Sequence, residues 1–199
     1  MFKLQLMTAD NYKKEGFKYQ VNYAFHQTQF GKSLIGILDN KEKSICHLSF
    51  VNKSETTSLE SLKKQWPKNE LLENLKETTK YIEIIFSENF KGLEENNEND
   101  EDSNFEDVIN IILKGTEFQI KVWTQLIEIP CGSTTTYEKV AQAIENPKAV
   151  RAVANAIAGN LVAYLIPCHR VMSKNGANKY AFGVECKLKI LNYEKEITN

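Results

Sequence analysis

The pattern of apolar and polar residues predicts strands in the first fifty positions. Apolar or aromatic residues alternate with polar ones over 19–25, a short apolar run covers 33–38, and residues 45–51 are apolar again. Residues 39–42 (Asp-Asn-Lys-Glu) have the composition of a turn. These runs predict a small antiparallel sheet.

Two helices are predicted after these strands. The first spans Ser58 to Trp66 and is stopped by Pro67, and the second begins near Asn69. The second helix carries apolar residues at helical spacing: Leu71, Leu75, Ile82, Ile85 and Phe86. Residues 94–102 contain only Glu, Asn and Asp, which predicts a solvated loop at about 91–106, with a functional acidic segment as the alternative. A further strand is predicted over 108–113.

The second half of the chain is predicted to be helical. Thr116 can cap a helix that runs to about Glu128, and Thr135 or Thr136 can cap the next helix, with Glu138 in capping-box position to Thr135. A third helix is predicted from an N-cap and proline at residues 146–147 to residue 158. The tight joint at 145–147 resembles a helix-turn-helix. An extended segment over 162–166 and a last helix over about 184–195 complete the series.

These elements predict an α/β (α+β) fold in two parts. Residues 1–113 form an N-terminal α/β lobe with the acidic loop, and residues 114–199 form a helical C-terminal domain. A chain of 199 residues is long enough for one sizeable core or for two small lobes with a shared interface.

Charge changes this picture little. The net charge is −1, but residues 115–199 carry ten Lys and Arg against seven Asp and Glu, so the first 114 residues are acidic. A polyanion would therefore meet the C-terminal half, although an excess of this size is also ordinary scatter.

The sequence also indicates the cellular compartment in which the protein is expected. It contains no run of eighteen apolar residues and begins without the apolar stretch of a signal peptide, so we expect no membrane partner. The four cysteines include no CxxC pair, which favours free thiols in a reducing compartment. We expect a cytoplasmic location, or a nuclear one in a eukaryotic cell.

The segment Ile166-Pro167-Cys168-His169-Arg170-Val171 carries candidate chemistry. A thiol with a pKa of about 8.5 is mostly protonated at neutral pH, so nucleophilic attack needs a base. His169 could act directly or through one water. Neighbouring side chains on an extended backbone point in opposite directions, so direct contact requires a turn. Taken alone, the pair also fits a buried structural cysteine beside a surface histidine.

Several linked segments carry a family resemblance. Pro-Cys-His-Arg-Val at 167–171 resembles the active-site signature of the O6-alkylguanine-DNA alkyltransferases, and Arg-Ala-Val at 151–153 resembles the recognition helix of that family. Residues 115–119 and 129–132 resemble further family segments. The chain is most similar to the C-terminal domain of the bacterial adaptive-response methyltransferase, and the match is dense over about 114–194. The resemblance implies a ribonuclease H-like N-terminal lobe.

The resemblance implies five catalytic residues. Cys168 would accept the alkyl group, and His169 would take its proton through a water. Glu194 would hold the histidine, as in a triad. Asn160 would shape the site, and Tyr137 would donate a proton to guanine N3.

It also implies a DNA interface and a substrate pocket. Arg151 would fill the space that the extruded nucleotide leaves in double-stranded DNA, and the small residues of its helix would allow close approach to the minor groove. The other expected DNA-binding residues are Ala149, Ala152, Asn155 and Thr136. The expected pocket residues are Tyr180, Ala181, Phe182, Val171 and Ala163.

Departures from the family pattern narrow the predicted substrate. Phe182 stands where wide-pocket relatives have glycine, and Leu161 and Ala163 replace prolines. The segment from Arg170 to Tyr180 is one residue shorter than expected. These features predict methyl or small alkyl groups on guanine as substrate, with O4-alkylthymine left open as a second substrate base, and weak reaction with free O6-benzylguanine.

The implied activity is DNA repair by one irreversible transfer to Cys168, by a monomer without a cofactor. Four alternatives compete with this interpretation. They are a non-catalytic lesion binder (relatives of that kind replace the cysteine, often with tryptophan), a helix-turn-helix regulator, a thiol hydrolase and a redox enzyme. His26, Cys46 and His47 fit no standard zinc spacing.

Overall fold

The computed structural model describes residues 2–15, 18–87, 109–174 and 179–198. The predicted acidic loop at 91–106 lies outside these ranges. No helix within them combines the length and the apolar composition that crossing a bilayer requires.

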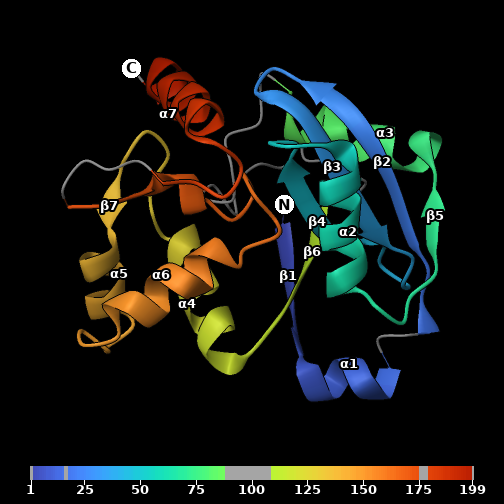
Figure 1. Cartoon of the computed structure of the whole chain (residues 1–199), viewed down its shortest axis with the longest axis horizontal. Helices are drawn as coiled ribbons and strands as arrows, with labels where there is room; N and C mark the ends of the chain where they lie inside the picture. The colour runs from blue at the N-terminus through green and yellow to red at the C-terminus, as the bar shows by residue number, and fades with distance from the viewer. Residues whose placement is uncertain (1, 16–17, 88–108, 175–178, 199) are drawn as a thin grey trace, which may run out of the picture.

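A six-stranded mixed sheet forms the N-terminal part (Figure 1). Its strands are β1 (Phe2–Thr8), β2 (Val21–Thr28), β3 (Gly31–Leu38), β4 (Ser44–Phe50), β5 (Leu71–Glu73) and β6 (Ile109–Gly115). The spatial order is β1-β6-β4-β3-β2-β5. The predicted antiparallel meander is present as β2-β3-β4, but β1–β6, β4–β6 and β2–β5 are parallel pairs. The α/β class is therefore confirmed, with parallel strands added at both edges.

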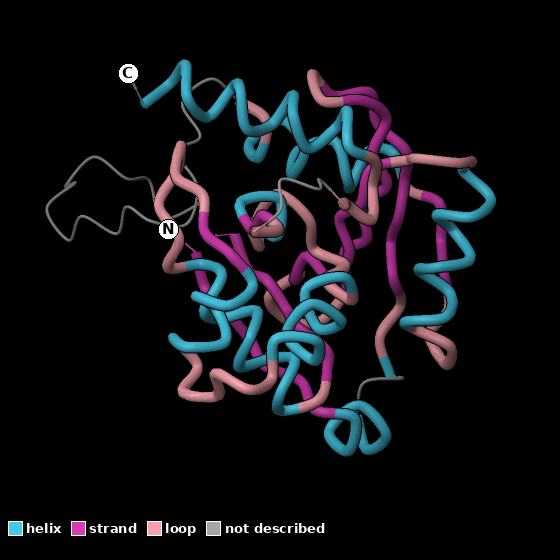
Figure 2. Tube along the Cα trace, turned by 60° about the vertical axis from the view of Figure 1, so that its left-hand side comes forward, coloured by secondary structure: helices cyan, strands magenta, loops and turns pink. Residues whose placement is uncertain are grey.

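Alternation along the strands gives the sheet two apolar faces. On one face, Leu34 and Leu38 pack with Leu62 and Trp66, which lie in or directly after α2 (Glu55–Gln65). On the other face, the neighbouring Ile35 and Ile37 belong to a larger core. That core also contains residues of α3 (Leu75–Ile85) and of the C-terminal helices. Figure 2 shows the strands lying between helices.

Two N-terminal predictions need correction. The helix expected from near Asn69 begins at Leu75, because residues 71–73 pair with β2 and the Asn74 side chain accepts a hydrogen bond from the Glu77 N–H. The helix expected from Ser58 begins earlier, because Ser54 caps it by accepting from the Thr57 N–H. The sequence patterns also missed β1, β5 and the short helix α1 (Ala9–Glu15).

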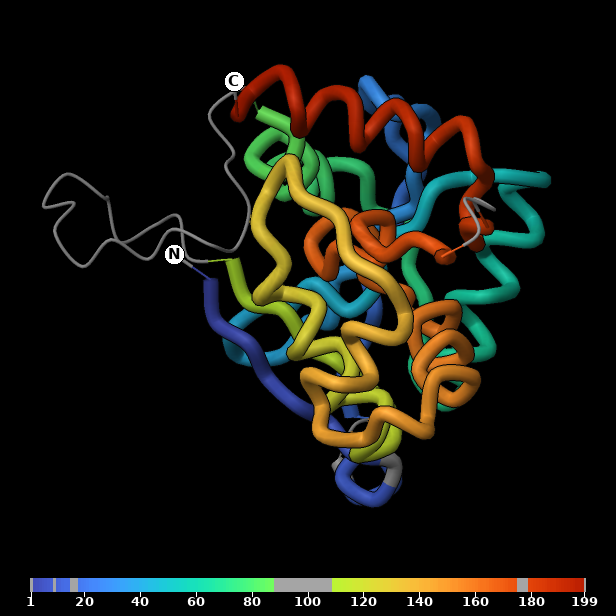
Figure 3. Tube along the Cα trace, turned by 90° about the vertical axis from the view of Figure 1, so that its left-hand side faces the viewer, coloured from blue at the N-terminus to red at the C-terminus, as the bar shows by residue number. Residues whose placement is uncertain are grey.

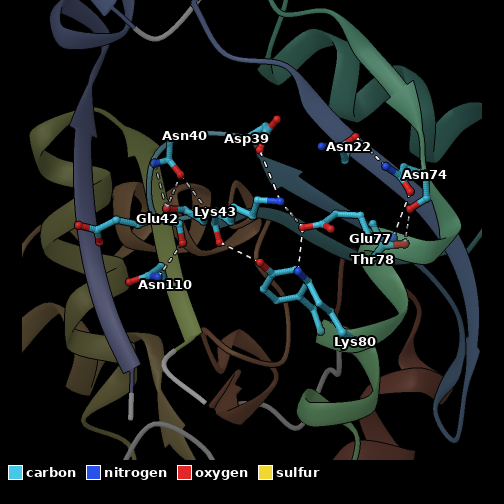
Figure 4. Close-up of polar contacts among 12 residues, drawn as sticks. Asn22, Asp39, Asn40, Glu42, Lys43, Asn74, Glu77, Thr78, Lys80 and Asn110 are labelled. Atoms are coloured by element: carbon cyan, nitrogen blue, oxygen red, sulfur yellow. Dashed lines mark hydrogen bonds and ion pairs between the residues drawn. The ribbon is translucent and has the colours of Figure 1, made fainter. Parts of the chain in front are cut away.

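A polar network fixes the turn between β3 and β4 against α3 (Figure 4). Lys43 Nζ lies 3.0 Å from Glu77 Oε1 and 3.9 Å from Asp39 Oδ1. The Tyr81 hydroxyl donates to the Lys43 carbonyl over 3.3 Å. These contacts join the sheet to α3 and include none of the predicted site residues.

The C-terminal part contains the predicted helices α4 (Glu117–Ile127), α5 (Tyr137–Ala143), α6 (Val150–Ala158) and α7 (Val184–Thr198). Thr116 and Gln119 form a capping box on α4. Thr136 caps α5, whereas Thr135 pairs with Val171 in the two-stranded sheet of β7 (Thr135–Thr136) and β8 (Val171–Met172), so the box with Glu138 is not formed.

The third predicted helix starts later than expected. Ala149 is its N-cap and makes no side-chain capping bond. Asn146 instead accepts from the Ala149 N–H through its backbone carbonyl, at 2.9 Å. The joint before it turns at Glu145, whose φ is +58°. The residues that signalled a helix start therefore form the turn between α5 and α6.

The core continues from the sheet into the segment that carries the predicted nucleophile. The Leu48 N–H donates to the Leu161 carbonyl and the Ala163 N–H donates to the Leu48 carbonyl, both over 2.7 Å. Residues 161–163 are thereby docked on β4, and residues 165–168 lie in the same buried cluster as Ile35 and Ile45, Pro167 excepted. The division at residue 113 stays a prediction, because β6 runs to Gly115 and this core includes residues from both sides.

Candidate active site

The predicted nucleophile, Cys168, is the first residue of a short helical turn. A 3-10 turn, η3, covers Cys168–Arg170 directly after Pro167. Cys168 is 5% exposed and borders a cavity of about 260 Å³. The other residues around this cavity are Tyr137, Ile157, Ala158, Lys179, Tyr180, Ala181 and Phe182. A substrate group in the cavity would therefore meet the thiol.

His169 is absent from this cavity's lining and is buried in the protein. Its Nε2 lies 2.8 Å from Glu194 Oε1, and both side chains are buried. An ionised carboxylate can only accept, so Nε2 carries the hydrogen and Nδ1 keeps its lone pair. Nδ1 is buried and has no hydrogen-bond partner among the described residues. The pair thus holds a basic nitrogen ready on the residue that follows Cys168 in the chain.

Glu194 also binds Arg170, a contact that the sequence analysis missed. Arg170 Nε lies 3.1 Å from each carboxylate oxygen, and Nη2 lies 2.9 Å from Oε1. Burial alone would raise the pKa of Glu194, but the bonds from His169 and Arg170 lower it. Burial lowers the pKa of His169, and Glu194 opposes part of that change. The resting site therefore holds a carboxylate and a neutral imidazole.

Asn160 holds the Cys168 thiol in place with a hydrogen bond. Its Nδ2 lies 3.1 Å from Cys168 Sγ and 2.9 Å from the Ile166 carbonyl, while its Oδ1 accepts from the Val162 N–H. Burial raises the pKa of Cys168, and the Asn160 bond opposes this. Cys168 is therefore a protonated thiol at rest, with a donor placed to stabilise the thiolate.

The predicted pocket residues divide into two groups. Tyr180, Ala181 and Phe182 line the cavity, and the Tyr180 hydroxyl lies 3.9 Å from Cys168 Sγ. Ala163 and Val171 are fully buried and absent from the described lining. Ala163 packs in a cluster with Phe30 and Phe50, and Val171 belongs to β8. Their assignment to the pocket is corrected accordingly.

The exposed face of α6 leads to the same cavity. Arg151, Ala152 and Asn155 are exposed on this helix, and Ala158 at its end borders the cavity. Tyr137 reaches the cavity from the start of α5, and burial raises its pKa. Figure 3 shows α5 and α6 facing the viewer below α7. The helix-turn-helix and the thiol therefore share one side of the molecule.

The two remaining interface candidates are less exposed. Ala149 and Thr136 are partly buried, and the Thr136 hydroxyl accepts from the Lys139 N–H. Both lie at helix starts, as N-caps of α6 and α5.

The histidines that could suggest a metal are engaged in other bonds. His26 Nε2 lies 2.8 Å from the Thr78 hydroxyl, and His47 bonds Gln65 and Ser49. Across the described ranges, no three His, Cys, Asp or Glu side chains are grouped as metal ligands would be. Cys46, Cys168 and Cys186 are free thiols.

A buried thiol beside a histidine–glutamate pair, at the end of an exposed helix-turn-helix, defines a cysteine-nucleophile protein with a surface suited to DNA. Residues 117–196 match the family described as "6-O-methylguanine DNA methyltransferase, DNA binding domain". A methylated-DNA–protein-cysteine methyltransferase of Methanosarcina mazei is 34% identical over 160 residues, which cover 80% of this chain and 89% of the relative. The chain belongs to the methylated-DNA–protein-cysteine methyltransferase family.

Two further relatives are longer than the part they share with this chain. A probable methyltransferase of Acanthamoeba polyphaga mimivirus is 54% identical over 90 residues, which are 45% of this chain and 60% of the relative. The Escherichia coli bifunctional transcriptional activator and DNA repair enzyme Ada is 31% identical over 191 residues, which are 96% of this chain and 50% of Ada. The resemblance to the adaptive-response protein is thereby confirmed.

A solved structure supports the fold. A crystal structure of a Mycobacterium tuberculosis OGT variant superposes with a TM-score of 0.63 at 25% identity, covering 88% of this chain and 93% of that one. The predicted combination of an N-terminal sheet and a helical C-terminal part is therefore a known architecture of this family.

Proposed function

We propose that this protein repairs DNA by transferring a methyl or other small alkyl group from O6 of guanine to Cys168. The observation that carries the proposal is the position of the thiol. It borders a cavity, adjoins the His169–Glu194 pair and lies at the end of the exposed face of α6. The relatives' names and the matched family agree with this chemistry.

The substrate base must leave the duplex to reach the thiol. O6 lies on the pairing edge of guanine, and extrusion costs a few kcal/mol, which is least for a mispaired base. The exposed face of α6 would enter the minor groove, with Arg151 in the space left by the extruded nucleotide. Readout in the minor groove is poor in sequence information, which suits repair at any sequence. The protein would act on double-stranded DNA as a monomer.

The transfer needs one proton removed and one supplied. His169 Nδ1 takes the Cys168 proton through a water, and Glu194 stabilises the resulting imidazolium. The new S–C bond forms as the C–O6 bond breaks. The departing guanine receives a proton at N3 from the Tyr137 hydroxyl. The His169 imidazolium then returns a proton to Tyr137 through solvent. Charge and protons balance without an external cofactor.

The product explains why each molecule would act once. A thioether at Cys168 is chemically stable, so the alkyl group stays on the sulfur after transfer. The protein is therefore both catalyst and acceptor.

The test is the intact mass of the protein after incubation with duplex DNA that contains O6-methylguanine. We expect a gain of one methyl group, mapped to Cys168, in wild type and in the control Cys131→Ser. Cys168→Ser should gain nothing. Tight binding without a mass change in wild type would refute transfer and favour the non-catalytic lesion binder.

A further inference from the structure

Lys187 is a buried cation to which the proposed transfer gives no role. It lies on α7, is 1% exposed, and its Nζ donates to the Val171 carbonyl over 2.7 Å. The ammonium also lies 6.0 Å from the centroid of the Tyr180 ring. In the part of the chain that the structure describes, no carboxylate lies within ion-pair distance of it.

A buried ammonium without an anion is unfavourable, because one carbonyl replaces only part of its hydration. Burial lowers the pKa of Lys187, and the charge interaction that opposes this comes from Cys168. The same interaction acts on the thiol, where Lys187 opposes the effect of burial. Tyr180 joins the two groups, because its hydroxyl lies 3.9 Å from Cys168 Sγ and its ring centroid lies 6.0 Å from Lys187 Nζ. Lys187 therefore gains a counter-charge when Cys168 loses its proton.

Other groups around the thiol do not supply this positive charge. Asn160 donates a neutral hydrogen bond, and Arg170 is committed to Glu194. The remaining titratable groups that interact with Cys168 would add negative charge or none: Tyr137, Tyr180 and Cys186. Lys187 also opposes protonation of His169, an effect that Glu194 offsets.

We propose that Lys187 is the positioning residue that balances the Cys168 thiolate formed when His169 takes the proton. Its ammonium stays protonated throughout, and its bond to Val171 fixes α7 against the segment that follows the nucleophile. This inference deepens the proposed function and rests on Cys168 being the reacting group.

The first test measures alkylation of Cys168 by iodoacetamide, followed by peptide mass spectrometry across pH. We expect Lys187→Met to slow labelling at pH 7 about tenfold and to move the rate profile to higher pH. Lys187→Arg should retain most of the rate. The control is Lys189→Met, on the same helix but exposed and paired with Glu185. A folded Lys187→Met protein with the wild-type profile would overturn the proposal.

A second test does not depend on the folding of a Lys187 variant. Lysine side-chain NMR titration of wild type and Cys168→Ser should show Lys187 losing its proton at a lower pH in the serine protein. Identical titrations would contradict the coupling. If wild type is labelled by iodoacetamide but takes no methyl from DNA, the proposed function fails and the role of Lys187 stands. If wild type takes the methyl and Lys187→Met does so with the same pH profile, only the Lys187 inference fails.

Discussion

Replacing Glu194 by glutamine removes the charge that organises the site. The carboxylate binds His169 Nε2 at 2.8 Å and accepts from Arg170 Nε and Nη2. All three side chains are buried. Glutamine keeps the shape but carries no charge, its one oxygen has two lone pairs for the three N–H donors that reach Glu194, and its amide donor would face one of those donors.

The expected cost is that of breaking a buried ion pair. Removing one partner leaves an uncompensated buried charge, here Arg170, and lowers the free energy of unfolding by about 3–5 kcal/mol. His169 also loses the acceptor that keeps the hydrogen on Nε2. Proton transfer by a positioned base contributes about 10²–10⁴-fold to a rate, so methyl transfer should slow at least a hundredfold.

Urea unfolding at pH 7.5 and single-turnover methyl transfer measure the two effects. Glu196→Gln, exposed on the same helix, is the control and should change neither. The stability difference has a defined pH dependence. Because the pKa of Glu194 is lowered in the folded protein, its contribution is complete above the unfolded pKa of about 4.3 and is lost as pH falls through the folded pKa. A Glu194→Gln protein that unfolds within about 1 kcal/mol of wild type and transfers methyl at the same rate would refute this reasoning.

Three further outcomes follow from other residues. Burial lowers the pKa of His47 to about 4, so acidification from pH 8 to pH 5 should lower the free energy of unfolding by about 2 kcal/mol through this residue. In urea titrations, the loss of stability over this pH range should be smaller by that amount in His47→Gln. Arg151→Ala should slow transfer from methylated duplex but leave the rate with free O6-methylguanine unchanged, whereas equal slowing of both would rule out a role in extrusion. Phe182 borders both the 260 Å³ cavity and a neighbouring one of about 300 Å³, so Phe182→Ala should join them and speed inactivation by free O6-benzylguanine several-fold; an unchanged rate would mean that another residue limits the pocket.

The sequence predicted those parts of the fold that depend on local pattern. The meander β2-β3-β4 and the Thr116 cap are encoded by neighbouring residues, and both are present. The parallel strands were missed because their partners are distant in sequence, as in the pairing of β1 with β6. The three residues of β5, which pair with β2, also belong to a run of apolar residues whose spacing fits a helix. Asn146 failed as a helix start because the same residue type also stabilises turns.

The residues of the candidate site could be predicted from the sequence, but the contacts between them could not, because those contacts join residues that are distant in the chain. Cys168 and His169 are adjacent, and their family resemblance supplied Asn160 and Glu194. Whether these residues meet in space is a tertiary fact: the structure pairs Asn160 with Cys168 and His169 with Glu194, and both pairs have one member in η3. Ala163 and Val171 were misplaced, because position near the nucleophile in the chain does not decide which side of a strand or bridge faces a cavity.

The sequence pattern of α7 contained a signal that would have identified Lys187, which the sequence analysis did not single out. Positions 187, 190, 191 and 194 lie on one helical face, and all four are buried. Two of them, Ile190 and Leu191, are apolar, whereas Lys187 and Glu194 are charges within an otherwise apolar stripe. A charge on the buried face of a helix requires a partner in the core, so each predicts a polar group opposite it. Glu194 meets His169 and Arg170, and by the same reasoning Lys187 needs an anion, which the site can supply only when Cys168 is ionised.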